Sequence, residues 1–80
     1  MSEISSDQLT LLLLLQRSPQ GSNWYKLGRV AIGRLSSPAV FTDVLKSLVA
    51  NGWVEELEGE VPAMPNLVLT VAGRRVVERA

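Results

Sequence analysis

Apolar and polar positions along the chain predict four helices and one pair of short strands. The first helix is expected over residues 6–17, because Ser5 or Ser6 can cap it and Ser5 with Gln8 has the spacing of a capping box. It should end before Ser18-Pro19-Gln20-Gly21, a combination that breaks helices.

Leucine dominates this first helix. Leu9 and the unbroken run Leu11 to Leu15 cover nearly its whole circumference instead of one stripe. A helix that is apolar all round is buried on more than one side, and in so short a chain a twin subunit is the simplest second contact. We therefore expect a homodimer with Leu11, Leu14 and Leu15 at its interface. A membrane-surface helix is disfavoured, because the segment lacks a lysine-rich polar face.

The next two predicted helices are joined by a short turn. The second spans residues 24–33, with Ser22 or Asn23 as its cap, and apolar residues recur in it at spacings of three and four: Trp24, Leu27, Val30 and Ala31. The third spans residues 38–51, because serine followed by proline suits a helix start and Asn51-Gly52 suits a left-handed end. Its buried face is expected to comprise Val40 or Phe41, Val44, Leu45 and Leu48.

A hairpin and a last helix complete the pattern. Residues 53–57 and 67–70 are expected to be strands, separated by a loop over residues 59–66 that contains two prolines. Thr70 can then cap a helix over residues 71–79, in which Val76 and Val77 face inward. Three helices, a two-stranded β-hairpin wing and a short C-terminal helix make an α+β winged helix-turn-helix fold.

Two motifs within this order resemble winged-helix transcription regulators of the PadR and MarR type. The stretch from Ser37-Pro38 through Leu45-Lys46-Ser47-Leu48 to Gly52-Trp53-Val54 resembles their recognition helix. Leu69-Thr70-Val71-Ala72-Gly73-Arg74 is similar to the Leu-Thr-x-x-Gly-Arg that ends their wing, and the resemblance covers about residues 8–80. It implies a regulator that binds double-stranded DNA with the helix around 38–51 in the major groove.

The outward face of that helix departs from the family pattern, which has basic or aromatic residues there. Here the outward face would have only one positive charge, on Lys46, and one negative charge, on Asp43. The expected residues of this face are Ala39, Thr42, Asp43, Lys46, Ser47 and Ala50.

Charge along the chain cancels overall but is unevenly distributed. Eight basic residues balance eight acidic ones, yet residues 16–50 carry five basic residues against Asp43 alone. Phosphates would meet Lys26, Arg34 and Lys46, with Ser36 or Ser37 donating near the helix N-terminus. Thr42 would touch a base edge or a thymine methyl group.

The hairpin region is acidic, with Glu55, Glu56, Glu58 and Glu60 and no basic residue in residues 51–70. These carboxylates would be unfavourable beside DNA phosphates, so two alternatives stay open. They protect an edge strand from pairing, which we favour, or they bind a basic protein partner. In the second case the domain would be a protein-interaction module without direct DNA binding.

The residue inventory disfavours several other classes. With no cysteine and no histidine, the chain offers no disulfide, no zinc-finger site and no catalysis by those side chains. Gly-rich phosphate loops and a Gly-x-Ser-x-Gly motif are also absent, so we expect neither an enzyme nor a cofactor or metal. The longest apolar run is too short to span a membrane, and there is no secretory signal pattern. We expect a cytoplasmic protein with a flexible N-terminus, 1–5, and one domain, 6–80.

Overall fold

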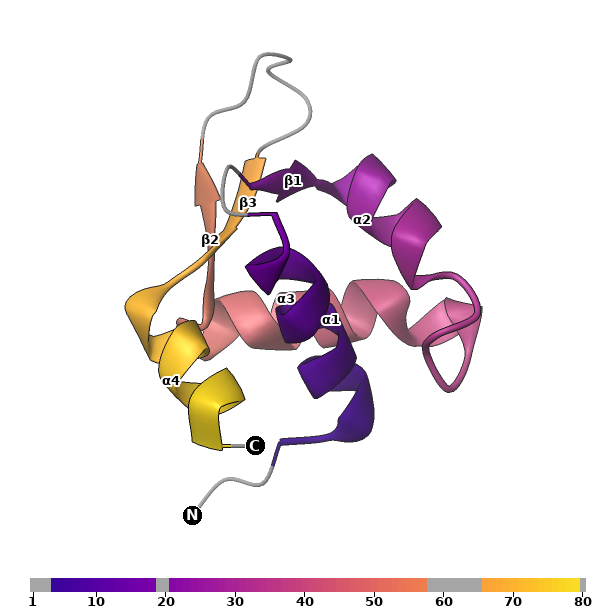
Figure 1. Ribbon diagram of the computed structural model, residues 1–80. Helices are drawn as coiled ribbons and strands as arrows, with labels where there is room; N and C mark the ends of the chain where they lie inside the picture. The colour runs from indigo at the N-terminus through magenta and orange to yellow at the C-terminus, as the bar shows by residue number, and fades with distance from the viewer. Residues whose placement is uncertain (1–3, 19–20, 58–65, 80) are drawn as a thin grey trace.

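A computed structural model describes residues 4–18, 21–57 and 66–79 (Figure 1). Within these ranges the helices are α1 (Ser6–Gln16), α2 (Trp24–Ala31), α3 (Phe41–Ala50) and α4 (Val71–Arg79), with a 3-10 helix, η1 (Pro38–Val40), leading into α3. The strands are β1 (Ser22–Asn23), β2 (Val54–Leu57) and β3 (Asn66–Leu69). This order and arrangement confirm the predicted winged helix-turn-helix. The predicted loop over residues 59–66 lies outside the described residues, apart from Asn66.

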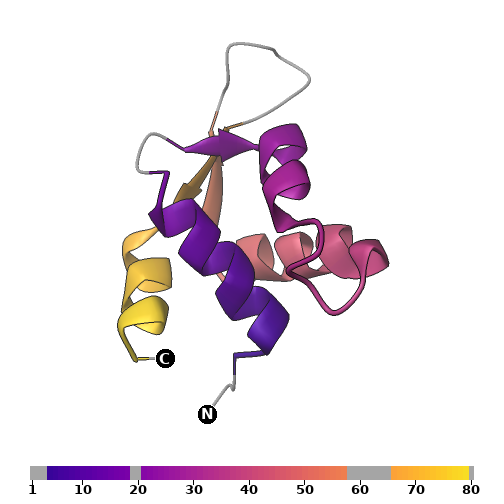
Figure 2. The same ribbon diagram turned by 45° about the vertical axis from the view of Figure 1, so that its right-hand side comes forward.

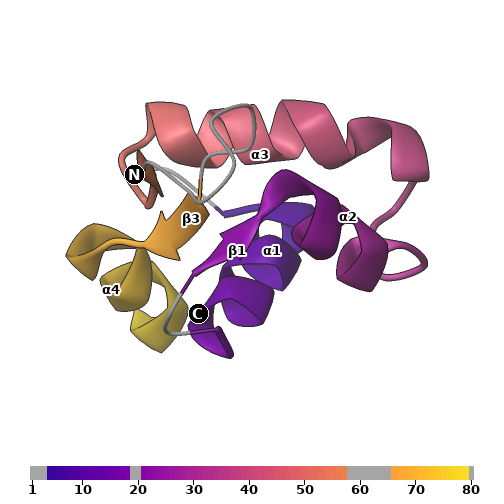
Figure 3. The ribbon, with the colours of Figure 1, turned by 90° about the horizontal axis from the view of Figure 1, so that it is seen from above.

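Helix α1 is the central helix of the molecule. It packs against α2, α3, α4 and β3, and Figures 2 and 3 show it between α2 and α4 with α3 crossing beside it. Its start is fixed by the predicted capping box, in which the Gln8 N–H donates to Ser5 Oγ over 3.1 Å and the Ser5 N–H donates to Gln8 Oε1 over 2.9 Å.

Four leucines of α1 lie in the core of a single chain. Leu11, Leu14 and Leu15 are 0%, 8% and 1% exposed, and Leu12 is also buried. The prediction that the first three form a dimer interface is therefore wrong, because neighbouring elements of the same chain already cover them. The apolar pattern has a simpler cause, because in this small fold α1 packs against three other helices and a sheet. Leu13 is the exception in the run and is 42% exposed.

The wing belongs to a three-stranded antiparallel sheet with the order β1-β3-β2. Strand β3 pairs with β2 from Asn66 opposite Leu57 to Leu69 opposite Val54, as expected for a hairpin. Strand β1, which the sequence analysis missed, adds only Ser22 and Asn23 to the other edge of β3. Two residues are too few to show an alternating pattern, and only tertiary pairing reveals them.

Helix α2 is shorter than predicted. It ends at Ala31, and its buried side chains are Leu27 and Ala31 alone. Val30, predicted to face inward, is 51% exposed, and Ile32 beyond the helix end is 68% exposed. In so short a helix the spacing of four between Leu27 and Ala31 defines the buried stripe, and Val30 lies beside it. Asn23 is the cap, because its Oδ1 accepts from the Lys26 N–H over 2.8 Å.

A Schellman motif ends α3 and leads into the hairpin. The Trp53 N–H donates to the Leu48 carbonyl and the Gly52 N–H donates to the Val49 carbonyl, both over 3.0 Å. Gly52 has a φ of 76°, so the predicted left-handed end is confirmed. At the other end the first turn is 3-10 instead of α, and Ser37 Oγ accepts from the Ala39 N–H over 3.3 Å.

Thr70 joins the end of α3 to the start of α4. Its Oγ1 accepts from the Gly73 N–H over 3.0 Å, as predicted for a helix cap, and also donates to the Gly52 carbonyl over 2.7 Å. The Thr70 N–H donates to the Trp53 carbonyl over 3.0 Å. These bonds fix the base of the wing relative to α3.

Candidate nucleic-acid interface

Helix α3 presents one polar stripe to solvent and one apolar stripe to the core. Leu45 and Leu48 are fully buried against the rest of the chain. The exposed positions recur at spacings of three and four and so share one side of the helix: Ala39, Thr42, Asp43, Lys46 and Ala50. Figure 3 shows α3 running along one side of the molecule. A helix that is free along one side can enter the major groove, which is about 12 Å wide.

The three cations predicted to contact phosphates all lie at the surface. Lys26 is on the first turn of α2, Arg34 is in the turn after α2, and Lys46 is in the middle of α3. None of them forms an ion pair with another residue in the described part of the chain. Their charges are therefore available to an anionic partner. The negative charge of Asp43, which is also on α3, opposes that of Lys46.

Of the hydroxyl groups in the predicted site, Thr42 is exposed on α3 and Ser37 is half-buried at the start of η1. Ser36 is already engaged: its N–H donates to Asp7 Oδ1 over 2.9 Å and its hydroxyl donates to Asp7 Oδ2 over 2.6 Å. The expectation that Ser36 donates to a phosphate does not fit this arrangement, because Asp7 occupies both of its donors.

Ser47, which was expected on the outward face, turns toward α1. Its Oγ accepts from Gln8 Nε2 over 3.1 Å and donates to the Val44 carbonyl over 2.6 Å. Sequence reasoning missed the roles of Asp7 and Gln8 here. In the sequence, Asp7 and Gln8 are recognisable only as part of a helix start. Their partners, Ser36 and Ser47, lie 29 and 39 residues away.

The two hydrogen bonds from Ser36 stabilise the charged form of Asp7 and lower the pKa of its carboxyl group; the bond from the hydroxyl is the larger cause. A carboxyl group whose pKa is lower in the folded state stabilises the fold above its unfolded pKa. That stabilisation is lost as the pH falls through the folded value.

Asp7→Asn should therefore destabilise the protein at neutral pH and have a diminishing effect in acid. Urea unfolding of both proteins at several pH values between 7 and 2 measures this difference. We expect the difference in unfolding free energy to shrink as the pH falls below about 4, the ordinary pKa of an aspartate. A difference that stays constant over this range would show that the Asp7 charge is not involved.

An aromatic surface adjoins this region where α2 meets α3. The rings of Trp24 and Phe41 pack edge to face, with centroids 6.0 Å apart, and both are half-buried. Tyr25 is exposed, and the Arg29 guanidinium lies 5.7 Å from the centre of its ring. These four residues, Gly28 and Ile32 line a shallow hollow of about 380 Å³.

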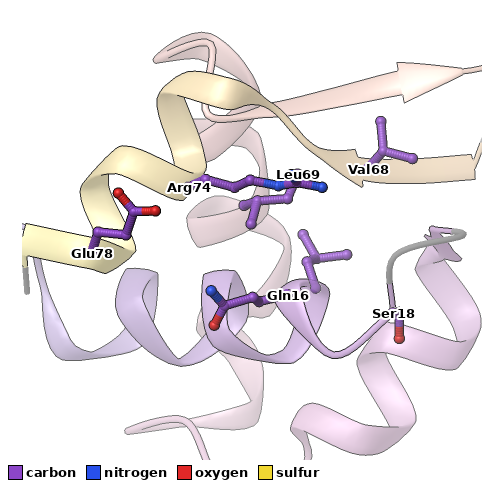
Figure 4. A pocket seen from close by; sticks show the side chains of 7 residues that line it. Gln16, Ser18, Val68, Leu69, Arg74 and Glu78 are labelled. Carbon is purple, nitrogen blue, oxygen red and sulfur yellow. The ribbon is translucent and has the colours of Figure 1, made fainter.

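A second hollow, of about 290 Å³, lies between the end of α1, β3 and α4 (Figure 4). It combines apolar side chains with polar ones, from Leu15, Gln16, Ser18, Val68, Leu69, Arg74 and Glu78. None of its lining residues comes from α2 or α3, so it is separate from the polar stripe of α3.

The acidic strand β2 is an edge strand, with Glu55 and Glu56 exposed. This position agrees with the interpretation that the carboxylates keep an edge strand from pairing with other chains. Glu58 and Glu60 lie outside the described residues. Within the described ranges no cluster of acidic side chains could hold a metal ion, and no helix is long and apolar enough to cross a bilayer.

Comparison with known proteins places the fold. No family profile and no curated protein sequence matches the chain. Among solved structures, a MarR variant from E. coli in complex with operator DNA is 23% identical, with a TM-score of 0.82 over 96% of this chain. The S. aureus MepR–DNA complex is 18% identical, with a TM-score of 0.80 over 95%. A zinc-responsive MarR family member from Lactococcus lactis, ZitR, is 19% identical, with a TM-score of 0.76 over 96%.

The chain spans only about half of each of these proteins, 53%, 60% and 51% of the respective chains. The similarity extends over at least 95% of this chain. The MarR part of the resemblance seen in the sequence is thus matched at the level of structure. The chain has the winged-helix fold of MarR-type transcription regulators.

Proposed function

We propose that this protein is a small DNA-binding transcription regulator that places α3 in the major groove of duplex DNA. The observation that carries the proposal is the solvent-facing stripe of α3, held by fully buried Leu45 and Leu48 on its other side. Two of the solved structures with the same fold, those of MarR and MepR, are complexes with DNA.

In this proposal the exposed cations position the domain and the α3 stripe reads the bases. Lys26, Arg34 and Lys46 contact phosphates from three successive elements of the helix-turn-helix. Thr42 faces a base edge or a thymine methyl group. Ser37 keeps its hydroxyl hydrogen available for a phosphate, because its Oγ acts only as an acceptor toward the Ala39 N–H.

A homodimer remains part of the proposal, without an assigned interface. Two copies would read half-sites about one helical turn of DNA apart, roughly 34 Å. Light scattering of the purified protein should give twice the chain mass of 8.7 kDa. The chain mass itself, at concentrations where DNA is bound, would contradict the dimer.

A cytoplasmic location likewise stays a prediction.

The alternative is a protein-interaction module that uses its acidic hairpin. It is weaker, because Glu55 and Glu56 on an edge strand already have an explanation that needs no partner.

Titration of labelled random-sequence duplex DNA, followed by fluorescence anisotropy, separates the two. With three phosphate contacts per chain, the logarithm of the association constant should fall with the logarithm of salt with a slope of about −2.7 per chain. Absence of binding at micromolar protein in low salt would overturn the DNA proposal.

A further inference from the structure

We propose that Asp7 and Gln8, neighbours in the first turn of α1, are positioning residues that fix the helix-turn-helix in the geometry required for DNA binding. Neither belongs to the exposed stripe of α3, and each reaches a different point of the α2–α3 unit. The expected effect on DNA binding rests on the proposed function, whereas the contacts themselves do not depend on DNA.

Asp7 holds the turn between α2 and α3. Both carboxylate oxygens accept hydrogen bonds from Ser36, one from its N–H and one from its hydroxyl. The Ile32 and Arg34 N–H groups tie the turn to carbonyls of α2, but not to α1. Of residues 32–36, Leu35 alone packs on the core, and Ile32, Gly33, Arg34 and Ser36 are exposed. Hydrogen bonds to a charged acceptor are about twice as strong as neutral ones, so this pair is the main directional contact that joins the turn to α1.

Gln8 connects α1 to the middle of α3. Its Oε1 accepts from the Ser5 N–H within the capping box, while its Nε2 donates to Ser47 Oγ. Ser47 in turn donates to the Val44 carbonyl, which completes a chain of three hydrogen bonds from the start of α1 to the α3 backbone. Ser47 directly follows Lys46, so this contact determines how the exposed stripe of α3 is rotated.

These two contacts give the packing of α3 on α1 a direction, which apolar packing alone does not. Leu45 and Leu48 attach α3 to the core, but apolar burial is non-directional and tolerates small shifts of one helix along another. Hydrogen bonds weaken steeply when distance or angle changes. Bonds at Ser36 and Ser47, eleven residues apart, therefore define both the place and the rotation of the recognition helix on α1.

Asp7→Ala tests the first contact, and Ser47→Ala tests the second while leaving the capping box intact. Thr10→Val is the matched control, because it removes a hydroxyl whose bond, to the Ser6 carbonyl over 2.8 Å, stays within α1. We expect Asp7→Ala and Ser47→Ala each to weaken duplex binding about 10-fold without changing the salt slope, since no phosphate contact is removed. The control should bind like the wild type.

The direction of the affinity change in Asp7→Ala distinguishes a loss of positioning from an effect of charge. Removing a negative charge would, by electrostatics alone, tighten binding to DNA, whereas loss of positioning weakens it. Binding as tight as or tighter than that of the wild type would overturn the proposal.

Amide hydrogen exchange of the free proteins provides a readout that needs no DNA. Faster exchange should be confined to residues 34–37 in Asp7→Ala and to residues 44–48 in Ser47→Ala. Unchanged exchange there, or uniformly faster exchange in all helices, would also overturn the positioning role. If wild-type protein fails to bind duplex, the proposed function fails, and local exchange alone decides whether these contacts hold α3.

Discussion

Replacing Arg34 and Lys46 together by glutamate should abolish binding to duplex DNA. Both side chains are exposed, without ion pairs in the described part of the chain. Arg34 lies in the turn before η1, and Lys46 lies in the middle of α3. Each reversal removes one phosphate contact and adds one repulsion. We expect an affinity loss of at least about 100-fold at low salt, and a salt slope that is smaller in magnitude by about 1.8.

Arg17→Glu combined with Arg75→Glu is the matched control. It changes the net charge by the same amount, and both residues are exposed on elements outside the helix-turn-helix, at the end of α1 and on α4. This variant should retain most of the affinity, apart from a weak long-range effect that salt screens. Equal losses in the two double variants would mean that net charge, and not the α3 face, governs binding.

Gly73→Ala should destabilise the fold by about 1–3 kcal/mol, although alanine is normally the better helix former. A methyl group at Gly73 would lie 2.2 Å from the Trp53 carbonyl oxygen and 2.8 Å from Leu69 Cδ1. The carbonyl is backbone, held by its hydrogen bond from Thr70, so it cannot easily move aside. Urea unfolding followed by tryptophan fluorescence should show a lower midpoint with an unchanged slope.

Gly28→Ala provides the comparison from within the same protein. A methyl group there would lie 3.4 Å from the Phe41 ring, an ordinary contact, in a helix with ordinary φ at that position. This substitution should leave stability unchanged or raise it by up to about 1 kcal/mol. If both alanines stabilise the protein, the close approach of α4 to Trp53 is not a constraint on the sequence.

Local chemistry explains why much of the fold could be predicted. The Ser5–Gln8 capping box, the Thr70 cap and the Asn51-Gly52 helix end each depend on residues close in sequence, and each is present in the structure. Their order was enough to predict a winged helix, and the structural similarity to MarR-type proteins agrees with it.

The features that could not be predicted depend on contacts distant in sequence. The leucines of α1 gave no indication of whether another subunit or the same chain covers them, and the structure shows that the same chain covers Leu11, Leu12, Leu14 and Leu15. Strand β1 was too short to recognise. Ser36 and Ser47 looked available to DNA because nothing near them in sequence identified Asp7 and Gln8 as their partners.

The most direct test of the α3 interface is a titration of the ¹⁵N-labelled protein with a random-sequence duplex at low salt, followed by amide chemical shifts. We expect the largest changes on residues 39–50 and around Lys26 and Arg34, with α4 little affected. Changes confined to β2 or α4, or no changes at micromolar duplex, would contradict it.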